Sequence, residues 1–120
     1  MIVYPGGYLE EGYLSMEEVT VTALAEVMKN RNVRVLDVRN PDEYRSGHVP
    51  GAELITMSTI PLRTADLSRD EKLFIICESS SRSWQVCAFL DKQGYQVVNV
   101  IGGTGAWRMN GLPLTQGMGA

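Results

Sequence analysis

Cysteine, histidine and long apolar runs are all scarce in this sequence of 120 residues. Its two cysteines lie ten positions apart and do not form a disulfide framework, so the expected compartment is a reducing cytoplasm. Its single histidine excludes a metal site built from several histidines. No apolar run approaches the roughly 18 residues of a membrane helix, and the first residues lack the pattern of a secretory signal.

A strong excess of charge of either sign is also missing. Eleven basic and 14 acidic residues give a formal net charge of −3, so nothing in the charge indicates a nucleic-acid partner. Hydrophobic residues make up 44% of the chain, which is typical of a globular domain with one proper core. We expect an irregular segment over residues 1–15, one domain over residues 16–114 and a tail over residues 115–120.

Short apolar strands alternate with amphipathic helices along most of the chain. This alternation implies right-handed crossovers and a mostly parallel sheet, so the predicted fold is α/β, with about five strands and helices on both faces. The strands are expected at residues 16–19, 33–38, 52–55, 73–76 and 97–101. The helices are expected at residues 20–30, 40–46, 61–67 and 83–93, and in a short segment that ends at Trp107.

The stretch LFIICESSSRSW, residues 73–84, carries the clearest chemical signal. A buried strand ends at Cys77, and a serine-rich loop then leads into a helix. Ligands of open α/β sheets bind beyond the carboxyl ends of the strands, and a loop that opens a helix presents free backbone N–H groups. A helix N-terminus and a nearby cation both lower the pKa of a thiol. Cys77 is therefore the predicted nucleophile.

The residues that follow Cys77 are predicted to form the substrate-binding loop. Arg82 has two available roles: its positive charge favours a thiolate, and its guanidinium can hold the loop by hydrogen bonds to carbonyl groups. The serine hydroxyls are donors for a terminal sulfur anion. The predicted loop residues are Glu78, Ser79, Ser80, Ser81 and Arg82.

Five residues elsewhere are open to both a functional and a structural interpretation. Asp37 and Arg39 lie at the carboxyl end of a strand, where they would either contact substrate or form an ion pair that braces the neighbouring loop. Cys87 lies on the apolar side of a helix, which favours a core residue. For His48 we expect ring nitrogens bonded to the backbone, with a general base as the alternative, and for Trp107 a core aromatic.

Three motifs resemble those of the rhodanese (sulfurtransferase) family. CESSSRS, residues 77–83, resembles its active-site loop C-x-x-G-x-R-S. Residues 35–52, VLDVRNPDEYRSGHVPGA, resemble D-V-R-x-x-x-E-[FY]-x-x-G-H-[IV]-P-G-A, and residues 102–111, GGTGAWRMNG, resemble G-G-x-x-A-W-x-x-x-G. Ser80 departs from the loop pattern, which usually has Gly there. A positive φ costs a non-glycine residue roughly 1–2 kcal/mol, so the loop has either a different backbone or some strain.

The resemblance implies the rhodanese-like three-layer fold over roughly residues 16–114, and a sulfurtransferase. Cys77 would take a sulfane sulfur from thiosulfate or a thiol persulfide, become a persulfide, and pass the sulfur to cyanide, a small thiol or a thiol protein. Two half-reactions through one covalent intermediate predict ping-pong kinetics. No metal, organic cofactor, nucleic acid or membrane is required.

Two other functions stay open. A cysteine phosphatase or arsenate reductase has five residues between its Cys and Arg, whereas four separate Cys77 from Arg82. A non-catalytic or regulatory persulfide-binding module would keep the fold without fast turnover. Glu78 bears on the donor, because family members that use thiosulfate well often resemble C-[RK]-x-G. An acid at this position predicts poor use of the thiosulfate dianion.

Overall fold

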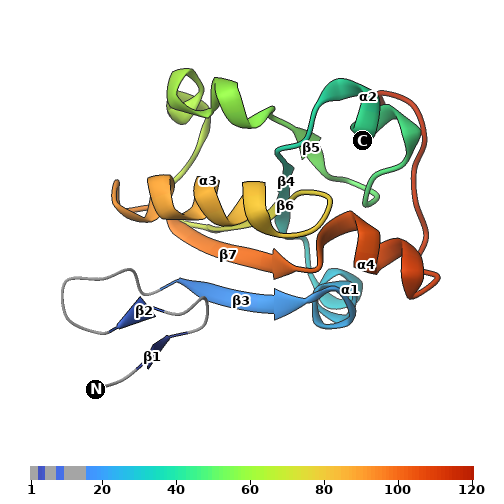
Figure 1. The fold of residues 1–120 in the computed structure, drawn as a ribbon, viewed down its shortest axis with the longest axis horizontal. Coiled ribbons are helices and arrows are strands. Elements are labelled where there is room, and N and C mark those ends of the chain that lie inside the picture. Colours follow the sequence, from blue (N-terminus) through green and yellow to red (C-terminus); the bar gives the residue numbers. More distant parts are fainter. Residues whose placement is uncertain (1–2, 5–7, 10–15) are drawn as a thin grey trace.

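The computed structural model of the chain describes residues 3–4, 8–9 and 16–120. A parallel five-stranded sheet forms its centre, in the order β3-β7-β6-β4-β5 (Figure 1). Its strands are β3 (Glu17–Thr20), β4 (Arg34–Asp37), β5 (Glu53–Leu54), β6 (Lys72–Ile76) and β7 (Gln96–Ile101). The helices are α1 (Val21–Asn30), α2 (Pro41–Ser46), α3 (Ser81–Asp91) and α4 (Gly103–Met109), with two 3-10 helices, η1 (Met57–Leu62) and η2 (Thr64–Asp66).

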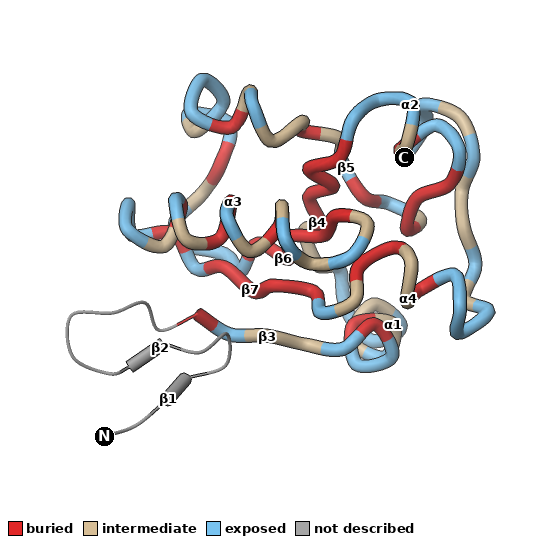
Figure 2. Tube along the Cα trace, viewed as in Figure 1, coloured by how far each residue is buried: buried red, intermediate tan, exposed pale blue. Residues whose placement is uncertain are grey.

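Side chains of β6 alternate between two apolar cores, one on each face of the sheet. Leu73 and Ile75 belong to the core that α3 and η1 cover, and Cys77 continues this face. Phe74 and Ile76 belong to the core under α1 and α4. Buried positions accordingly run along β4, β6 and β7 in Figure 2. A strand buried on both faces is typical of a parallel sheet between two helical layers, and the predicted three-layer α/β fold is confirmed.

The predicted helix starts at Thr20 and Asn40 are confirmed, and each has a local cause. The hydroxyl of Thr20 accepts a hydrogen bond from the backbone N–H of Ala23 at 3.1 Å, as an N-cap residue does. At the start of α2 the backbone N–H of Asn40 donates to the carboxylate of Glu43, and Pro41 follows at the first helical position. The cap at Asn40 starts α2 shortly after β4, beside the carboxyl ends of the strands.

Two predicted helices differ from the structure. The helix expected at residues 61–67 is found as 3-10 turns, the end of η1 and the whole of η2, rather than as one continuous α-helix. Pro61 lies inside η1, and a proline has no N–H for an α-helical bond at that point. Helix α3 begins at Ser81 rather than at Ser83, because the carbonyl of Ser80 already accepts the N–H of Trp84 and so closes the first turn.

Two short strands lie apart from the main sheet. Strand β1 (Val3–Tyr4) pairs antiparallel with β2 (Tyr8–Leu9). Both fall within the segment 1–15 that we expected to be irregular, and the remainder of this segment is outside the described residues. The division of the chain into residues 1–15, the domain 16–114 and the tail 115–120 stays a prediction. Among the described helices, none has the length and apolar character to cross a membrane.

Candidate active site

Cys77 is the first residue after β6, at the carboxyl end of the sheet. Its side chain is fully buried, and its Sγ lies 3.3 Å from the hydroxyl oxygen of Ser83, a buried residue in the first turn of α3. Its carbonyl oxygen accepts hydrogen bonds from the backbone N–H of Thr104 at 2.8 Å and from the Thr104 hydroxyl at 3.1 Å. The strand, α3 and α4 therefore all fix the position of this thiol.

The first turn of α4 holds the carbonyl groups of the loop. Besides the bonds to Cys77, the N–H of Gly105 donates to the carbonyl of Glu78 at 2.9 Å. A Cβ on Gly103 would clash with the carbonyl of Cys77 and approach the carbonyl carbon of Glu78 to 2.7 Å, and its φ is +59°. Only glycine meets both conditions without strain. Gly103 is therefore what lets α4 approach the loop.

The carbonyl groups of the loop have hydrogen-bond partners in α4, but its backbone N–H groups do not. Within the described part of the chain, the N–H groups of residues 78–83 have no protein acceptor. The first N–H groups of a helix have no partner inside the helix, and α3 begins here. Such a row of free donors beside a thiol is suited to bind an anion.

Arg82 forms a bidentate ion pair with Glu43 of α2. Its two terminal nitrogens lie 2.7 and 2.8 Å from the two carboxylate oxygens. The hydrogen bonds from Arg82 lower the pKa of Glu43 to about 2, and those to Glu43 raise the pKa of Arg82. Of the two predicted roles of Arg82, bonding to loop carbonyls is therefore wrong, because the guanidinium instead ties the start of α3 to α2. Its charge still acts on Cys77 through space.

Asp37 and Arg39 form a buried ion pair that braces the loop. The guanidinium of Arg39 donates to both carboxylate oxygens of Asp37, at 2.8 to 3.1 Å, and to the carbonyl of Gly47 at 2.8 Å. Its remaining terminal nitrogen reaches the carboxylate of Glu78 at 3.0 Å. Of the two interpretations of this pair, the structure shows the brace.

The remaining singled-out residues lie in structural positions. Cys87 is fully buried, and burial raises the pKa of its thiol. The ring nitrogens of His48 lie 2.8 and 2.7 Å from the carbonyl oxygens of Tyr44 and Gly119. Trp107 is buried, and its ring N–H donates to a backbone carbonyl. The three structural interpretations are confirmed. Among the described residues no three acidic, His or Cys side chains gather as a metal ion would need.

Comparison with known proteins agrees with this architecture. The model of the rhodanese-like domain family matches residues 20–110. This chain belongs to the rhodanese-like domain family. A protein of Allochromatium vinosum named sulfurtransferase is 40% identical over 84 residues, which are 69% of this chain and 78% of that protein.

Solved rhodanese-like structures have the same fold. A rhodanese-like domain protein from Staphylococcus aureus is 34% identical, with a TM-score of 0.73 over 77% of this chain and 91% of that one. A rhodanese-related protein from Thermoplasma volcanium is 31% identical, with a TM-score of 0.77 over 82% of this chain and 97% of that one. These proteins share the arrangement of sheet and helices that places Cys77 at its strand end.

Ser80, which stands where the rhodanese pattern has Gly, keeps a positive φ. Its φ of 155° and ψ of −23° make it the only non-glycine with positive φ among the described residues. Such backbone costs roughly 1–3 kcal/mol. Its hydroxyl accepts the N–H of Gly102 at 2.8 Å, a bond that glycine could not make. Of the two alternatives for this position, the structure has the strained loop, with a compensating bond to α4.

Glu78, the second departure from the rhodanese pattern, is not a free carboxylate. One oxygen pairs with Arg39 and the other with Arg108 of α4, each at 3.0 Å. The prediction that its charge repels an anionic donor assumed an unpaired acid, and this assumption is wrong. Two cations now balance it. The exposed side chains of Ser79 and Ser81 flank this part of the rhodanese loop.

Several residues that build the site escaped the sequence interpretation. Glu43 is the acid of the quoted upstream motif, so its place in the rhodanese pattern was an available signal. Ser83 ends the loop motif, but the sequence indicates for it only the start of a helix and not its contact with Cys77. Arg108 and Asn99 had no sequence signal, because only the folded chain brings α4 and β7 against the loop.

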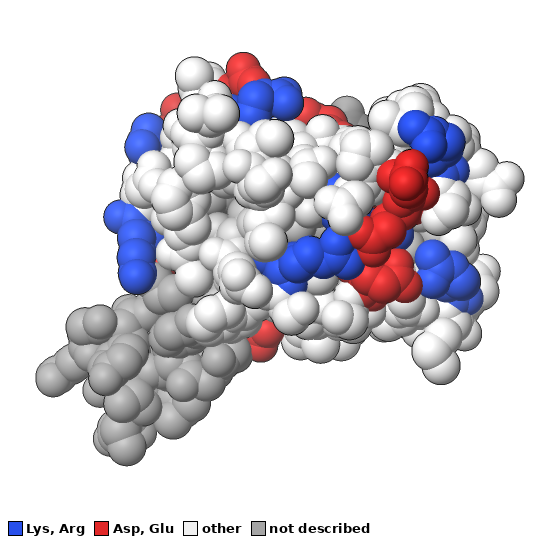
Figure 3. Space-filling model, turned by 45° about the horizontal axis from the view of Figure 1, so that its top comes forward, with Lys and Arg blue, Asp and Glu red and all other residues white. Residues whose placement is uncertain are grey.

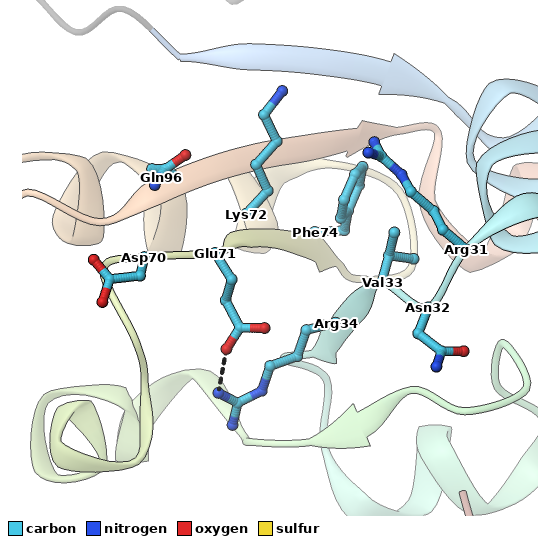
Figure 4. A pocket seen from close by; sticks show the side chains of 9 residues that line it. All are labelled: Arg31, Asn32, Val33, Arg34, Asp70, Glu71, Lys72, Phe74 and Gln96. Carbon is cyan, nitrogen blue, oxygen red and sulfur yellow. Dashed lines mark ion pairs between the residues drawn. The ribbon is translucent and has the colours of Figure 1, made fainter.

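A polar cavity of about 320 Å³ lies at the opposite end of the sheet. The first residues of β4, β6 and β7 line it, whereas Cys77 follows the last residue of β6. Arg34 and Glu71 point toward each other at its edge in Figure 4, and Arg34 also pairs with Glu53. Arg34 and Glu71 thus pair with each other, and the cavity forms no part of the rhodanese loop.

Proposed function

We propose that this protein is a rhodanese-type sulfurtransferase that moves a sulfane sulfur from a donor to a thiophilic acceptor through a Cys77 persulfide. The single observation that carries the proposal is a row of N–H groups at residues 78–83 that have no acceptor among the described residues, in the loop that directly follows Cys77 at the carboxyl end of β6. The sulfurtransferase name of the Allochromatium relative supports the same reaction class. The proposed site of action is the cytoplasm.

In the first half-reaction the thiolate of Cys77 attacks the outer sulfur of the donor. A bond forms between Sγ and that sulfur, the sulfur–sulfur bond of the donor breaks, and the donor remnant leaves with the bonding electron pair as sulfite or as a thiolate. The terminal sulfur of the new persulfide carries the negative charge. The free N–H groups of the loop stabilise this charge, because preorganised donors act strongly on an anion away from water.

In the second half-reaction an acceptor nucleophile attacks the terminal sulfur. The persulfide bond breaks, its electron pair returns to Sγ, and Cys77 regains its thiolate. Cyanide, a small thiol or a protein thiol each has the required lone pair. No step needs an external oxidant or reductant, since sulfane sulfur passes from one nucleophile to the next in the same oxidation state.

The paired arginines favour a donor of low charge. Arg39, Arg82 and Arg108 each already hold a carboxylate. On the face shown in Figure 3, acidic and basic side chains likewise lie together in a mixed cluster beside a wide uncharged area. A thiosulfate dianion finds no surplus of positive charge there, so we propose a thiol persulfide as the better donor.

Replacing Glu78 by Gln tests this choice of donor. Glu78→Gln would free the exposed Arg108 while keeping the shape of the side chain. One released charge about 6 Å from a dianion is worth several kcal/mol at an effective dielectric of 20 before screening by salt. We expect kcat/KM for thiosulfate to rise about tenfold and that for a thiol persulfide to change little. An equal change for both donors would contradict the charge argument.

The burial of Cys77 favours a second candidate, a regulatory module that holds a persulfide without fast turnover. Steady-state transfer to cyanide, measured with a thiosulfate and a thiol-persulfide donor, separates the two. The enzyme predicts turnover with at least one donor and parallel double-reciprocal lines, as for ping-pong kinetics. A Cys77 persulfide that forms but passes on no sulfur would identify the module. If no persulfide forms and no turnover is seen, both candidate functions are overturned.

A further inference from the structure

The hydroxyl of Ser83 lies between the thiol of Cys77 and the amide of Asn99. Its oxygen is 3.3 Å from Sγ of Cys77, 2.6 Å from Oδ1 of Asn99 and 3.0 Å from the carbonyl oxygen of Ser80. Ser83 and Asn99 are both buried. Water therefore does not share in these contacts, and the hydroxyl has a single proton for three neighbours.

The proton of Ser83 decides which form of Cys77 is favoured. The two oxygens can only accept, and the shortest contact places the proton toward Oδ1 of Asn99. With the proton there, the contact between Sγ and the Ser83 oxygen is a hydrogen bond only when Cys77 is a thiol whose S–H donates to Ser83. A thiolate gains a hydrogen bond from Ser83 only when that proton turns toward sulfur, which leaves Oδ1 without its hydrogen bond.

Turning the Ser83 hydroxyl toward sulfur removes a hydrogen bond from Oδ1 of Asn99 and one from the carbonyl of Ser80. The first loss is costly and the second is small. Among the described residues, Ser83 is the only donor to Oδ1 of Asn99, so a turn of the hydroxyl leaves a buried amide oxygen unsatisfied. The carbonyl of Ser80 still accepts the N–H of Trp84 when the hydroxyl turns away. Asn99 is thus the competitor that holds the proton away from sulfur.

Glu18 on the edge strand β3 fixes which end of the Asn99 amide faces Ser83. It stands opposite Asn99 in the parallel pairing of β3 with β7, and its carboxylate accepts the amide Nδ2–H at 3.2 Å. A carboxylate cannot donate, so the NH₂ end must face Glu18 and the oxygen must face Ser83. An acid on one edge of the sheet thereby sets the direction of a hydrogen bond beside the nucleophile.

We propose that Glu18 and Asn99 are positioning residues that control the balance of thiol and thiolate at Cys77 through the proton of Ser83. This inference rests on the proposed function, since it concerns the nucleophile of that reaction. In the resting protein the chain Glu18–Asn99–Ser83 favours the neutral thiol. A change that turns or removes the Asn99 oxygen releases the Ser83 proton to the thiolate and makes Cys77 more reactive.

Other charged and titratable groups lie on the elements around Cys77 and stay constant in the test. Arg82, held by Glu43, acts from the start of α3, and Cys87 from the same helix. Asp37, the last residue of β4, pairs with Arg39, and Glu78, directly after Cys77, pairs with Arg108 of α4. None of these groups is altered in the variants below.

The test measures the pH dependence of Cys77 alkylation by iodoacetamide, followed on the tryptic peptide that ends at Arg82. Asn99→Leu removes the competing oxygen at similar volume. We expect the midpoint of alkylation to move down by about one pH unit, the size of a hydrogen bond to a charged group. The same substitution in a Ser83→Ala background should leave the midpoint of that background unchanged, because no hydroxyl proton remains to be redirected.

Glu18→Lys provides a surface variant that leaves the buried residues in place. A lysine donates, so the amide of Asn99 turns its oxygen outward and its NH₂ toward Ser83, and the midpoint should again move down by about one pH unit. Glu17→Lys makes the same change in charge on the other side of β3, where Glu17 faces Lys72. It should have a clearly smaller effect.

Alkylation needs no sulfur donor, so its outcome is independent of whether the protein transfers sulfur. A midpoint unchanged or raised in both Asn99→Leu and Glu18→Lys overturns the proposal. So does an equal shift in Glu17→Lys, or a full shift of Asn99→Leu in the Ser83→Ala background. A failure of sulfur transfer with the predicted alkylation shifts would instead overturn the proposed function alone.

Discussion

The two cysteines of this protein are equally buried and differ in nearly everything else. Cys77 and Cys87 belong to the same apolar core, on the α3 side of the sheet. Cys77 has the Ser83 hydroxyl at 3.3 Å, the free N–H groups of residues 78–83 and the charge of Arg82 close by. Cys87 lies in the middle of α3, where burial raises the pKa of its thiol.

The comparison teaches that burial alone does not decide whether a thiol is inert. Burial raises the pKa of the Cys87 thiol, whereas the strand end places backbone donors and a cation beside Cys77. A helix interior has its N–H groups bonded to its own carbonyls, so the backbone of α3 around Cys87 offers no donor to a charged sulfur. The position in the fold, at the end of β6 and before α3, makes the difference.

Removing each thiol in turn has the largest expected effect. Cys77→Ser should abolish sulfur transfer with the fold intact, because a hydroxyl neither ionises near neutral pH nor forms a persulfide. Cys87→Ser should keep transfer and lose some stability by burying a hydroxyl. Transfer assays with circular dichroism measure both. If Cys87→Ser were also inactive while folded, a disulfide relay between the two cysteines would replace the persulfide mechanism.

Gly103→Ala disturbs the backbone contacts that α4 makes with Cys77 and leaves those of Cys87 unchanged. The added Cβ would strike the backbone of the loop after Cys77, so we expect at least a tenfold loss of kcat/KM and about 1–3 kcal/mol of destabilisation. Gly111→Ala is the matched control. Gly111 has a similar positive φ of +68° with nothing within 4 Å of a Cβ, so its variant carries the backbone strain alone. Equal losses in both variants would show that loop contact is irrelevant.

Arg82→Ala tests whether charge distinguishes the two thiols. Loss of the nearby cation should move the midpoint of Cys77 alkylation up by about one pH unit, and slow persulfide formation accordingly. Arg45→Ala removes an exposed arginine of α2 and serves as the control. An alkylation profile that is identical in wild type and Arg82→Ala would restrict Arg82 to its bond with Glu43.

The same ion pair makes stability depend on acid. The pKa of Glu43 is lowered to about 2 by its bonds with Arg82, below the ordinary value of about 4.3. The contribution of this pair is therefore complete above about pH 4.3 and is lost as the pH falls through about 2. Urea unfolding across this window should show a smaller loss of stability in Arg82→Ala than in wild type. Equal losses of stability in the two proteins would show that Glu43 does not contribute to the acid dependence of unfolding.

Ser80 is expected to give the smallest effect. Ser80→Ala keeps the unfavourable backbone and loses the bond to the N–H of Gly102, which should cost about 1 kcal/mol. Ser80→Gly loses the same bond but removes roughly 1–2 kcal/mol of strain, so its stability should stay near wild type. Urea unfolding midpoints at unchanged m values compare them. A Ser80→Gly variant less stable than Ser80→Ala would contradict the strain.

Much of this architecture was predictable because it follows local rules. The apolar run before Cys77 and the caps at Thr20 and Asn40 indicated strands, helices and their order, and three motifs indicated the rhodanese family. The helix expected at residues 61–67 is of the 3-10 type instead of a continuous α-helix, because Pro61 inside η1 has no N–H for an α-helical bond.

The partners of charged side chains were not predictable, because they come from distant parts of the chain. Glu78 meets Arg39, 39 positions earlier, and Arg108, 30 positions later. Read alone, its charge indicated repulsion of an anionic donor, whereas the fold balances it. The link from Cys77 through Ser83 to Asn99 likewise exists only once β7 lies beside β6.

The central claim, that Cys77 and not Cys87 carries the transferred sulfur, is tested most directly by mass spectrometry. The protein is incubated with a sulfur donor, its intact mass is measured, and a tryptic digest separates the two cysteines at Arg82. We predict a gain of one sulfur atom, located on the peptide 73–82, with no gain on the peptide 83–92. Sulfur on the peptide 83–92, or no gain with any donor, would contradict the persulfide mechanism.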